Sequence, residues 1–404
     1  MLLLFLSFSM LATNANGQVQ PWDAALHLLP QARVDEFNAR CLDGSAPGYF
    51  IRRNASDTRW KFHLQGGGWC LSPADCLARS QGLLGSSATW PASLSAFWQP
   101  EGAGFYGLMA PNNATNDFNP FGEWNFVWLA YCDGSSFTSD KDAPVVVNGT
   151  NVYMRGRAIL DAHLAELEAT AGFLSTATEV IVSGTSAGGL ATYLHASYVA
   201  SRLTSGGSTV AVPDAGFFFD HETYGKPGVH QWLDSITTAI EPGLWNATLL
   251  GPLAGCLSAP PSAQRARCFL PEGSFKWQTV KFFIVNSLYD PANLGIVYGL
   301  NCNLYTSCSP AELAAVHAYA VDLQSSILAT INPSRDSYYL TSCYQHEESC
   351  RARDWFGITI GGQTMNSTFT AWYESGASAA SRRVDVAWPG DSSCAAQGFT
   401  HGAC

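Results

Sequence analysis

Short apolar runs alternate along this chain with longer segments in which apolar residues recur at helical spacing. The clearest runs rich in β-branched and aromatic residues are 60–64, 125–131, 179–183, 282–286 and 337–341. Runs of this length and composition are typical of strands, with 337–341 expected as the last one. Helical patterns cover 153–169 and 310–328, the second beginning after Ser309 with a proline in its first turn. This alternation predicts an α/β fold with a mostly parallel central sheet flanked by helices.

One of these runs leads directly into a turn of the form Gly-x-Ser-x-Gly. The turn is Gly184-Thr185-Ser186-Ala187-Gly188, and a helix-compatible stretch, 187–199, follows it. A strand, this turn and a helix together are typical of a nucleophile elbow, which exposes the serine on a tight corner. Gly184 and Gly188 fit the lack of space beside the serine. The pattern predicts a nucleophile at Ser186, which then needs a base, an acid and an oxyanion hole.

Candidates for the base are the histidines that follow Ser186, because the α/β-hydrolase order is Ser, then Asp or Glu, then His. These are His221, His230, His317, His346 and His401. His346 directly follows an expected strand and lies three residues after Cys343, which could anchor its loop through a disulfide. We therefore expect His346 to be the base.

The acid has more than one candidate. Asp290 stands at the end of the strand 282–286, between Ser186 and His346 in the chain. Asp214 and Asp220 are rivals. A loop aspartate is usually a turn cap, but a position just past a strand is where parallel sheets place their ligands. We therefore expect Asp290 to orient the base.

A glycine run after the strand 60–64 is a candidate for the oxyanion hole. In Gly66-Gly67-Gly68-Trp69, backbone N–H groups can approach an oxyanion closely, and Ala187 after the nucleophile supplies another. We expect an oxyanion hole at Gly67, Gly68 and Ala187, and a substrate-pocket wall at Trp69, for which core packing is the alternative. The glycine run lacks the Lys-Ser/Thr of a phosphate-binding loop.

The net charge of the chain narrows the classes of partner. The chain of 404 residues has a formal net charge of −11 and only 13% charged residues. This acidity argues against nucleic acid and anionic membranes as partners, and mildly against a polyanionic substrate.

We find no internal repeat, charge block or low-complexity linker, so 18–404 is expected to form a single domain.

Several features agree on export from the cell. Residues 1–17 have an apolar, uncharged start and a small polar end, as in a signal peptide, and no stretch is long enough to span a membrane. Twelve cysteines predict up to six disulfides. Their spacing does not suggest zinc, so no metal is expected. Cys302/Cys308 and Cys394/Cys404 could close short loops, although the pairing is open. The candidate glycosylation sites are Asn54, Asn113, Asn148, Asn246 and Asn366.

Taken together, these residues resemble the pectin acetylesterase family, which includes the Notum-type lipid deacylases. The resemblance covers Cys41 to Cys404. Its motifs occur in order: Cys41-Leu42-Asp43-Gly44-Ser45, Gly66-Gly67-Gly68-Trp69-Cys70, Tyr131-Cys132-Asp133-Gly134-Ser135-Ser136-Phe137, Arg155-Gly156, Ser183-Gly184-Thr185-Ser186-Ala187-Gly188-Gly189, Asp214-Ala215-Gly216, Asn286-Ser287-Leu288-Tyr289-Asp290 and Ser342-Cys343-Tyr344-Gln345-His346. The segment after Tyr131 looks like the plant branch.

The resemblance implies an α/β-hydrolase-like fold, stapled by disulfides, and a serine esterase that needs no metal or cofactor. By motif it places the nucleophile at Ser186, the acid at Asp290 and the base at His346, with the oxyanion hole at Gly67, Gly68 and Ala187. One departure concerns the base: in plant members a cysteine directly follows this histidine, whereas Glu347, Glu348 and Ser349 intervene here. We hypothesise that the two carboxylates raise the pKa of His346 and shift the optimum for activity to higher pH.

The leading interpretation is a secreted hydrolase of the cell wall or extracellular matrix that removes acetyl groups from a pectin-like polysaccharide. An alternative is a Notum-like enzyme that cleaves a fatty acyl ester from a protein. A third is a catalytically silent, glycosylated binding protein on an esterase scaffold. Hydrolysis of acetyl and octanoyl esters would separate the first two, and loss of activity in Ser186→Ala would exclude the third.

Overall fold

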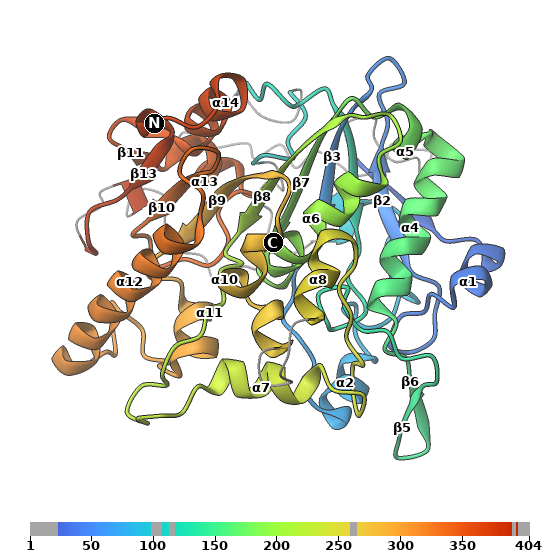
Figure 1. The fold of residues 1–404 in the computed structure, drawn as a ribbon, viewed down its shortest axis with the longest axis horizontal. Helices are drawn as coiled ribbons and strands as arrows, with labels where there is room; N and C mark the ends of the chain where they lie inside the picture. The colour runs from blue at the N-terminus through green and yellow to red at the C-terminus, as the bar shows by residue number, and fades with distance from the viewer. Residues whose placement is uncertain (1–22, 98–106, 113–117, 259–264, 390–392, 395–404) are drawn as a thin grey trace, which may run out of the picture.

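A nine-stranded sheet forms the centre of the molecule (Figure 1). The computed structural model describes residues 23–97, 107–112, 118–258, 265–389 and 393–394. The strands lie in the order β1-β2-β4-β3-β7-β8-β9-β10-β13. β1, β2 and β4 pair antiparallel, and every other neighbouring pair is parallel. The expected α/β-hydrolase-like class, with a mostly parallel sheet flanked by helices, is confirmed.

The elements have the following bounds. Strands of the central sheet are β1 (Ala25–Leu28), β2 (Gly48–Arg52), β3 (Arg59–Leu64), β4 (Asn125–Leu129), β7 (Glu179–Thr185), β8 (Ser208–Asp214), β9 (Lys281–Ser287), β10 (Ser337–Thr341) and β13 (Arg382–Val384). Two hairpins are β5 (Val145–Val147) with β6 (Thr150–Val152), and β11 (Thr359–Ile360) with β12 (Gln363–Thr364). The α-helices are α1 (Gln31–Phe37), α2 (Pro73–Arg79), α3 (Leu94–Phe97), α4 (Gly156–Ala171), α5 (Phe173–Thr176), α6 (Ala187–Arg202), α7 (Gln231–Ala239), α8 (Ala254–Leu257), α10 (Pro271–Ser274), α11 (Pro291–Asn293), α12 (Pro310–Thr330), α13 (Ala352–Gly357) and α14 (Met365–Ser375). Short 3-10 helices are η1 (Gly251–Leu253), η2 (Ala266–Phe269), η3 (Phe275–Trp277) and η5 (Ala379–Ser381), and η4 (Leu294–Tyr298) is a π-helix.

The strands expected from the apolar runs are present, and the structure adds others. β8, which contains Pro213, is not among the strands expected from the sequence, yet it lies between β7 and β9. The expectation that 337–341 is the last strand is wrong. β13 pairs parallel with β10 further along the chain, through only three residues, too few to show an alternating pattern.

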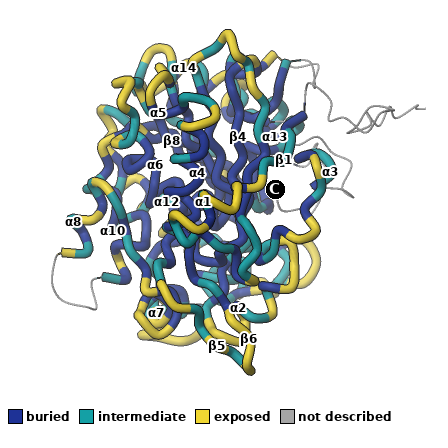
Figure 2. Tube along the Cα trace, turned by 90° about the vertical axis from the view of Figure 1, so that its right-hand side faces the viewer, coloured by how far each residue is buried: buried dark blue, intermediate teal, exposed yellow. Residues whose placement is uncertain are grey.

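Two successive residues of β9 show how the two faces of the sheet are covered. Phe282 stacks on Tyr193 of α6, with 5.5 Å between ring centroids. Phe283 points the other way and contacts Phe369 and Trp372 of α14, at 5.2 Å and 5.5 Å. Because successive side chains in a strand point to opposite faces, α6 and α14 lie on opposite sides of the sheet. Figure 2 shows the buried strands inside and the exposed residues on the outer helices and the β5–β6 hairpin.

The carboxyl ends of the parallel strands meet at one edge of the sheet. The helices α2, α7 and α11 come after β3, β8 and β9 and lie along the lower edge in Figure 1. In open parallel sheets this is the edge that binds ligands. The predicted site residues on the loops after these strands therefore share one edge.

Disulfides cross-link this edge. The structure contains Cys41–Cys132, Cys70–Cys76, Cys256–Cys268, Cys302–Cys308 and Cys343–Cys394, and Cys350 is disulfide-bonded as well. Within the described residues no cysteine is free. The short Cys302/Cys308 loop is confirmed, whereas a Cys394/Cys404 loop is wrong because Cys394 bonds to Cys343 across 51 residues of chain. Cys394 therefore pairs with a cysteine that is close to it in the fold rather than with one close to it in the sequence.

Some predictions fall on residues that the structure does not describe. These are the signal peptide at 1–17, Asn113, His401 and Cys404. Among the described helices none has the length and apolarity needed to cross a bilayer. The described residues also contain no group of three or more His, Cys, Asp or Glu side chains suited to a metal ion.

Candidate active site

Ser186 occupies a sharp corner between β7 and α6. Its φ of 55° and ψ of −120° are uncommon for a residue with a side chain and are held by the surrounding structure. Its backbone N–H donates to the carbonyl of Asp214 at 2.9 Å. A Cβ on Gly184 would lie 2.2 Å from the carbonyl oxygen of Gly188, and one on Gly188 would lie 2.0 Å from that of Leu64. Both positions therefore require glycine, as the elbow pattern predicted.

Asp290 and His346 are brought together at this edge of the sheet. The Nδ1 atom of His346 lies 2.7 Å from Oδ2 of Asp290. The other carboxylate oxygen, Oδ1, accepts from the N–H groups of Ala292 and Asn293 and so caps α11. Asp290 is 1% exposed, so its orientation is determined by these bonds rather than by solvent. The pair has the geometry of an acid that orients a base.

Several charges act on the imidazole of His346. Burial lowers its pKa, but the adjacent Asp290 carboxylate, through its charge and its hydrogen bond, raises it, and Glu347 and Asp214 add to that rise. The net result is a pKa of about 9. The site therefore favours the imidazolium form, which develops when a histidine accepts a proton from a serine.

The other histidines that follow Ser186 have different partners. His221 lies 3.1 Å from Asp322, His230 lies 2.6 Å from Asp220, His317 Nδ1 lies 3.0 Å from the hydroxyl of Tyr289, and His401 is outside the described residues. Asp220 also forms an ion pair with Arg267 at 2.6 Å. Among the described histidines of this region, only His346 pairs with Asp290.

Asp214, a rival for the acid, connects the two halves of the site instead. Its carbonyl accepts from Ser186, while its Oδ2 accepts from the N–H groups of Glu348 and Ser349 at 2.7 Å and 2.6 Å and from the Ser349 hydroxyl. Burial raises the pKa of Asp214 to about 7, although these hydrogen bonds lower it. Asp214 thus ties the loop that carries His346 to the corner that carries Ser186. The sequence offered Asp214 only as a rival acid and did not indicate this bridging role.

The two glutamates after His346 differ in their surroundings. Glu347 has a left-handed φ of 63° and is 1% exposed, and its Oε1 lies 3.9 Å from Nε2 of His346. Nε2 is the ring nitrogen opposite the Asp290 contact. Glu348 instead accepts from the hydroxyl of Thr341 at 2.6 Å, and burial raises its pKa well above the usual range. Glu347 is therefore the glutamate whose charge acts on the imidazole of His346.

We expect Glu347→Gln to move the pH–activity profile to lower pH. Neutral His346 is the form that accepts a proton, so kcat/KM rises with pH through the pKa of His346, about 9. Removing the Glu347 charge destabilises the imidazolium and lowers that pKa, which shifts the rising limb down by about 1 pH unit. Measuring kcat/KM for an aryl acetate between about pH 5 and pH 11 tests this.

Glu348→Gln is the matched control, because the Glu348 carboxyl accepts from the Thr341 hydroxyl, whereas it is Glu347 that approaches Nε2 of His346. Its rising limb should coincide with that of the unaltered protein. A Glu347→Gln profile that also coincides would show that Glu347 does not influence the base.

The glycine run after β3 packs directly against the elbow. A Cβ on Gly66 would lie 2.2 Å from the carbonyl oxygen of Thr185 and 3.1 Å from Cβ of Ser186. Gly67 and Gly68 have φ values of 127° and 70°, which favour glycine. Ala187 is the first residue of α6, so its N–H has no partner within the helix. The three predicted oxyanion-hole residues therefore lie on the two segments that meet at Ser186.

Two side chains fix the orientation of the glycine run. Arg79 Nη2 donates to the carbonyl of Gly67 at 2.7 Å, and the Tyr131 hydroxyl donates to that of Gly68 at 3.0 Å. In a trans peptide the N–H points away from the C=O, so anchoring these carbonyls orients the N–H groups of the next residues in the opposite direction. Neither Arg79 nor Tyr131 was predicted, although Tyr131 begins one of the family motifs.

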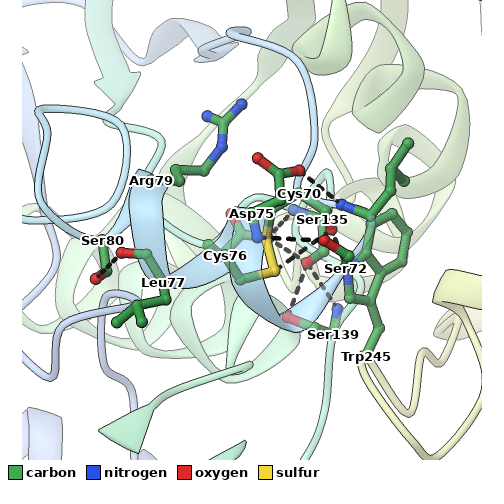
Figure 3. The surroundings of a disulfide bond; sticks show 12 residues. Cys70, Ser72, Asp75, Cys76, Leu77, Arg79, Ser80, Ser135, Ser139 and Trp245 are labelled. Carbon is green, nitrogen blue, oxygen red and sulfur yellow. Dashed lines mark hydrogen bonds between the residues drawn. A yellow bond between two sulfur atoms is a disulfide. The ribbon is translucent and has the colours of Figure 1, made fainter. Parts of the chain in front are cut away.

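A disulfide fixes the helix that carries Arg79. Cys70–Cys76 links the end of the glycine run to α2, the helix that ends at Arg79 (Figure 3). Ser72 caps the start of α2, and the indole N–H of Trp245 donates to the carbonyl of Cys70 at 2.9 Å. The glycine run is thus preorganised before any substrate binds.

Trp69 lies behind the glycine run and is 8% exposed. Its ring packs on Trp232 and Phe218, at 4.6 Å and 4.9 Å between centroids. Its indole N–H donates to the Ser136 hydroxyl, which in turn donates to the carbonyl of Ala187, each at 2.7 Å. Trp69 therefore has a packing role, and its role as a pocket wall stays a prediction. Ser136, which sequence reasoning did not single out, links Trp69 to the elbow.

The candidate glycosylation sites differ in accessibility. Asn148 and Asn246 are exposed, both with left-handed φ values. The side-chain amides of Asn54 and Asn246 donate to the carbonyls of Glu123 and Asp140, and Asn366 accepts from the Trp355 indole, so these three are engaged. Asn148, at the tip of the β5–β6 hairpin, has the most open position, and glycosylation itself stays a prediction.

This chain is similar in sequence to several known proteins. A family model described as Pectinacetylesterase matches residues 18–395. Pectin acetylesterase 5 of Arabidopsis thaliana is 27% identical over 384 residues, covering 90% of this chain and 84% of that protein. Pectin acetylesterase 11 of the same plant is 28% identical over 356 residues, covering 83% and 84%. The palmitoleoyl-protein carboxylesterase NOTUM of Homo sapiens is 24% identical over 367 residues, covering 87% and 66%.

Proposed function

The chain belongs to the pectinacetylesterase family and is a carboxylic ester hydrolase, and from this premise we propose that it removes acetyl groups from a pectin-like polysaccharide outside the cell. The observation that supports this most is the 2.7 Å contact between His346 and Asp290. The loop that carries His346 is held next to Ser186 by Asp214, whose carboxylate accepts from the N–H of Glu348 and whose carbonyl accepts from the N–H of Ser186. The plant relatives named as pectin acetylesterases support the choice of an acetyl group and a polysaccharide.

In the proposed mechanism Ser186 attacks the acetyl carbonyl while His346 accepts its proton at Nε2. Asp290 holds the Nδ1–H tautomer and stabilises the imidazolium. The N–H groups of Gly67, Gly68 and Ala187 donate to the oxyanion of the tetrahedral intermediate. His346 then donates its proton to the departing sugar oxygen, which leaves an acetyl group on Ser186.

Water completes the reaction. His346 takes a proton from the water, the resulting hydroxide attacks the acetyl-enzyme, and acetate leaves as the proton returns to Ser186. Every step uses side chains and backbone groups of this chain. The proposal includes a signal peptide at 1–17, one domain over 18–404, and glycans on the candidate asparagines.

Acetate release from a panel of acetylated substrates tests this proposal. The panel contains acetylated pectins, acetylated xylans and acetylated neutral glycans, with Ser186→Ala as the control for enzymatic release. We expect release from pectins and faster hydrolysis of an aryl acetate than of the matching octanoate. Release from none of the polymers would contradict the polysaccharide substrate, and faster octanoate hydrolysis would favour a fatty acyl ester, as in the name of the human NOTUM relative.

A further inference from the structure

Three aromatic residues form a cluster beside the candidate active site: Tyr305, Tyr344 and Trp388, here called the aromatic corner. The Tyr305 ring meets Trp388 at 74° with 5.3 Å between centroids, and it meets Tyr344 at 68° with 5.9 Å. The Trp388 indole N–H donates to the Tyr305 hydroxyl at 3.2 Å. The rings thus meet edge to face and form two walls at a steep angle rather than a stack.

The aromatic corner is continuous with the Asp290–His346 pair. Tyr344 precedes His346 by two residues, and after burial the Asp290 carboxylate is the main cause that raises the pKa of Tyr344. On the other side, Tyr289 precedes Asp290 and its hydroxyl lies 3.0 Å from Nδ1 of His317. The His317 ring lies 6.4 Å from Trp388. Aromatic rings therefore extend from both sides of the pair to the aromatic corner.

Covalent and hydrogen bonds hold the aromatic corner rigid. Cys302–Cys308 closes the loop of Tyr305, and the Tyr344 hydroxyl donates to the carbonyl of Cys302 at 3.4 Å. Cys343–Cys394 links the Tyr344 loop to the chain after β13, which also carries Trp388. Asp385 accepts from the hydroxyl of Ser342 at 2.9 Å, which joins the same two segments. A rigid surface loses little conformational entropy when it binds a ligand.

The aromatic corner differs from the aromatic clusters of the core because part of it is exposed to solvent. Tyr344 is buried at its base, Trp388 is partly exposed, and Tyr305 is 46% exposed. An exposed aromatic patch next to a catalytic group is typical of a ligand-binding surface. The three rings carry no charge at neutral pH, so they suit an uncharged face of a ligand. The C–H-rich face of a pyranose ring has this character, and the Tyr305 hydroxyl can hydrogen bond to a sugar hydroxyl.

We propose that the aromatic corner is a sugar-binding subsite that holds a pyranose ring of the polysaccharide next to the residue that carries the scissile acetyl group. The proposal rests on the proposed function, because it takes its ligand from the same substrate. It assigns Tyr305 and Trp388 to polymer binding and leaves the reaction with small acetate esters to the groups around Ser186.

The proposed subsite is tested by measuring oligosaccharide binding and ester hydrolysis separately. In a Ser186→Ala background, calorimetry with oligosaccharides from pectin measures affinity without turnover. We expect Tyr305→Ala and Trp388→Ala each to weaken this binding about fivefold or more, whereas Tyr305→Phe, which keeps the ring, retains most of it. With Ser186 present, both alanine variants should raise KM for acetylated pectin and leave kcat/KM for an aryl acetate within about twofold of the unaltered protein.

Phe118→Ala is the matched control, because Phe118 is an aromatic residue that is 72% exposed and whose backbone carbonyl accepts from Asn366 of α14, away from the aromatic corner. It should alter neither affinity nor KM. Unchanged affinity and KM in both alanine variants, with acetate still released from pectin, would overturn the subsite and leave the proposed function standing. Oligosaccharide binding that depends on Tyr305 and Trp388, with no acetate released from any polymer, would support the subsite and reject the acetylesterase function.

Discussion

Replacing Ser186 with alanine is expected to reduce kcat for an aryl acetate by roughly 10⁴-fold or more. Without the hydroxyl no acetyl-enzyme can form, so the Asp290–His346 pair and the N–H groups of the oxyanion hole are left to act on water alone. Stopped-flow measurement of the product alcohol and end-point measurement of acetate check this result. The burst that marks acetyl-enzyme formation should also disappear.

The variant is expected to keep the fold. Alanine and serine have similar requirements at the φ of 55°, and no hydrogen bond between described residues involves the Ser186 hydroxyl. The thermal midpoint and circular dichroism spectrum should match those of the unaltered protein. Ser183→Ala, on the preceding strand β7, is a useful comparison, since Ser183 contacts His63 in the core rather than the site. Retained hydrolysis in a folded Ser186→Ala protein would reject Ser186 as the nucleophile.

Asp290→Asn should cause the second largest loss, about 10⁴-fold in kcat. Asparagine keeps an oxygen that can cap α11, so the helix start survives. Its amide N–H₂ would face Nδ1 of His346, however, and would favour the tautomer with its proton on Nε2. That nitrogen could then no longer accept a proton from Ser186. Steady-state kinetics with an aryl acetate, at a pH where the base is neutral, measure this loss.

The control for this variant is Asp220→Asn. Asp220 was a rival for the acid, but it pairs with His230 and Arg267. We expect its kcat to remain within about threefold of the unaltered protein, because Asp220 contacts His230 and Arg267 rather than the imidazole of His346. If Asp290→Asn keeps its activity while Asp220→Asn loses it, the assignment of the acid moves to Asp220.

Local sequence was sufficient to predict much of the framework. β7, the corner at Ser186 and α6 follow from an apolar run, two required glycines and a helical stretch, all within neighbouring residues. The strand ends near Asp290 and His346 were visible for the same reason. Where a residue such as Pro213 opposes the local signal, the prediction failed, and β8 forms because β7 and β9 pair with it on both sides.

The contacts between segments distant in the chain could not be predicted in this way. The bridging role of Asp214 and the Cys343–Cys394 disulfide join residues separated by 51 or more positions. A sequence pattern reports the preferences of neighbouring residues, whereas these contacts depend on the order of strands in the sheet and the path of each loop. The sequence by itself therefore determined the nucleophile elbow and the strand-end positions. The tertiary structure decided the bridge from Asp214 to the His346 loop and the Cys343–Cys394 pairing, because these depend on which loops fold against each other.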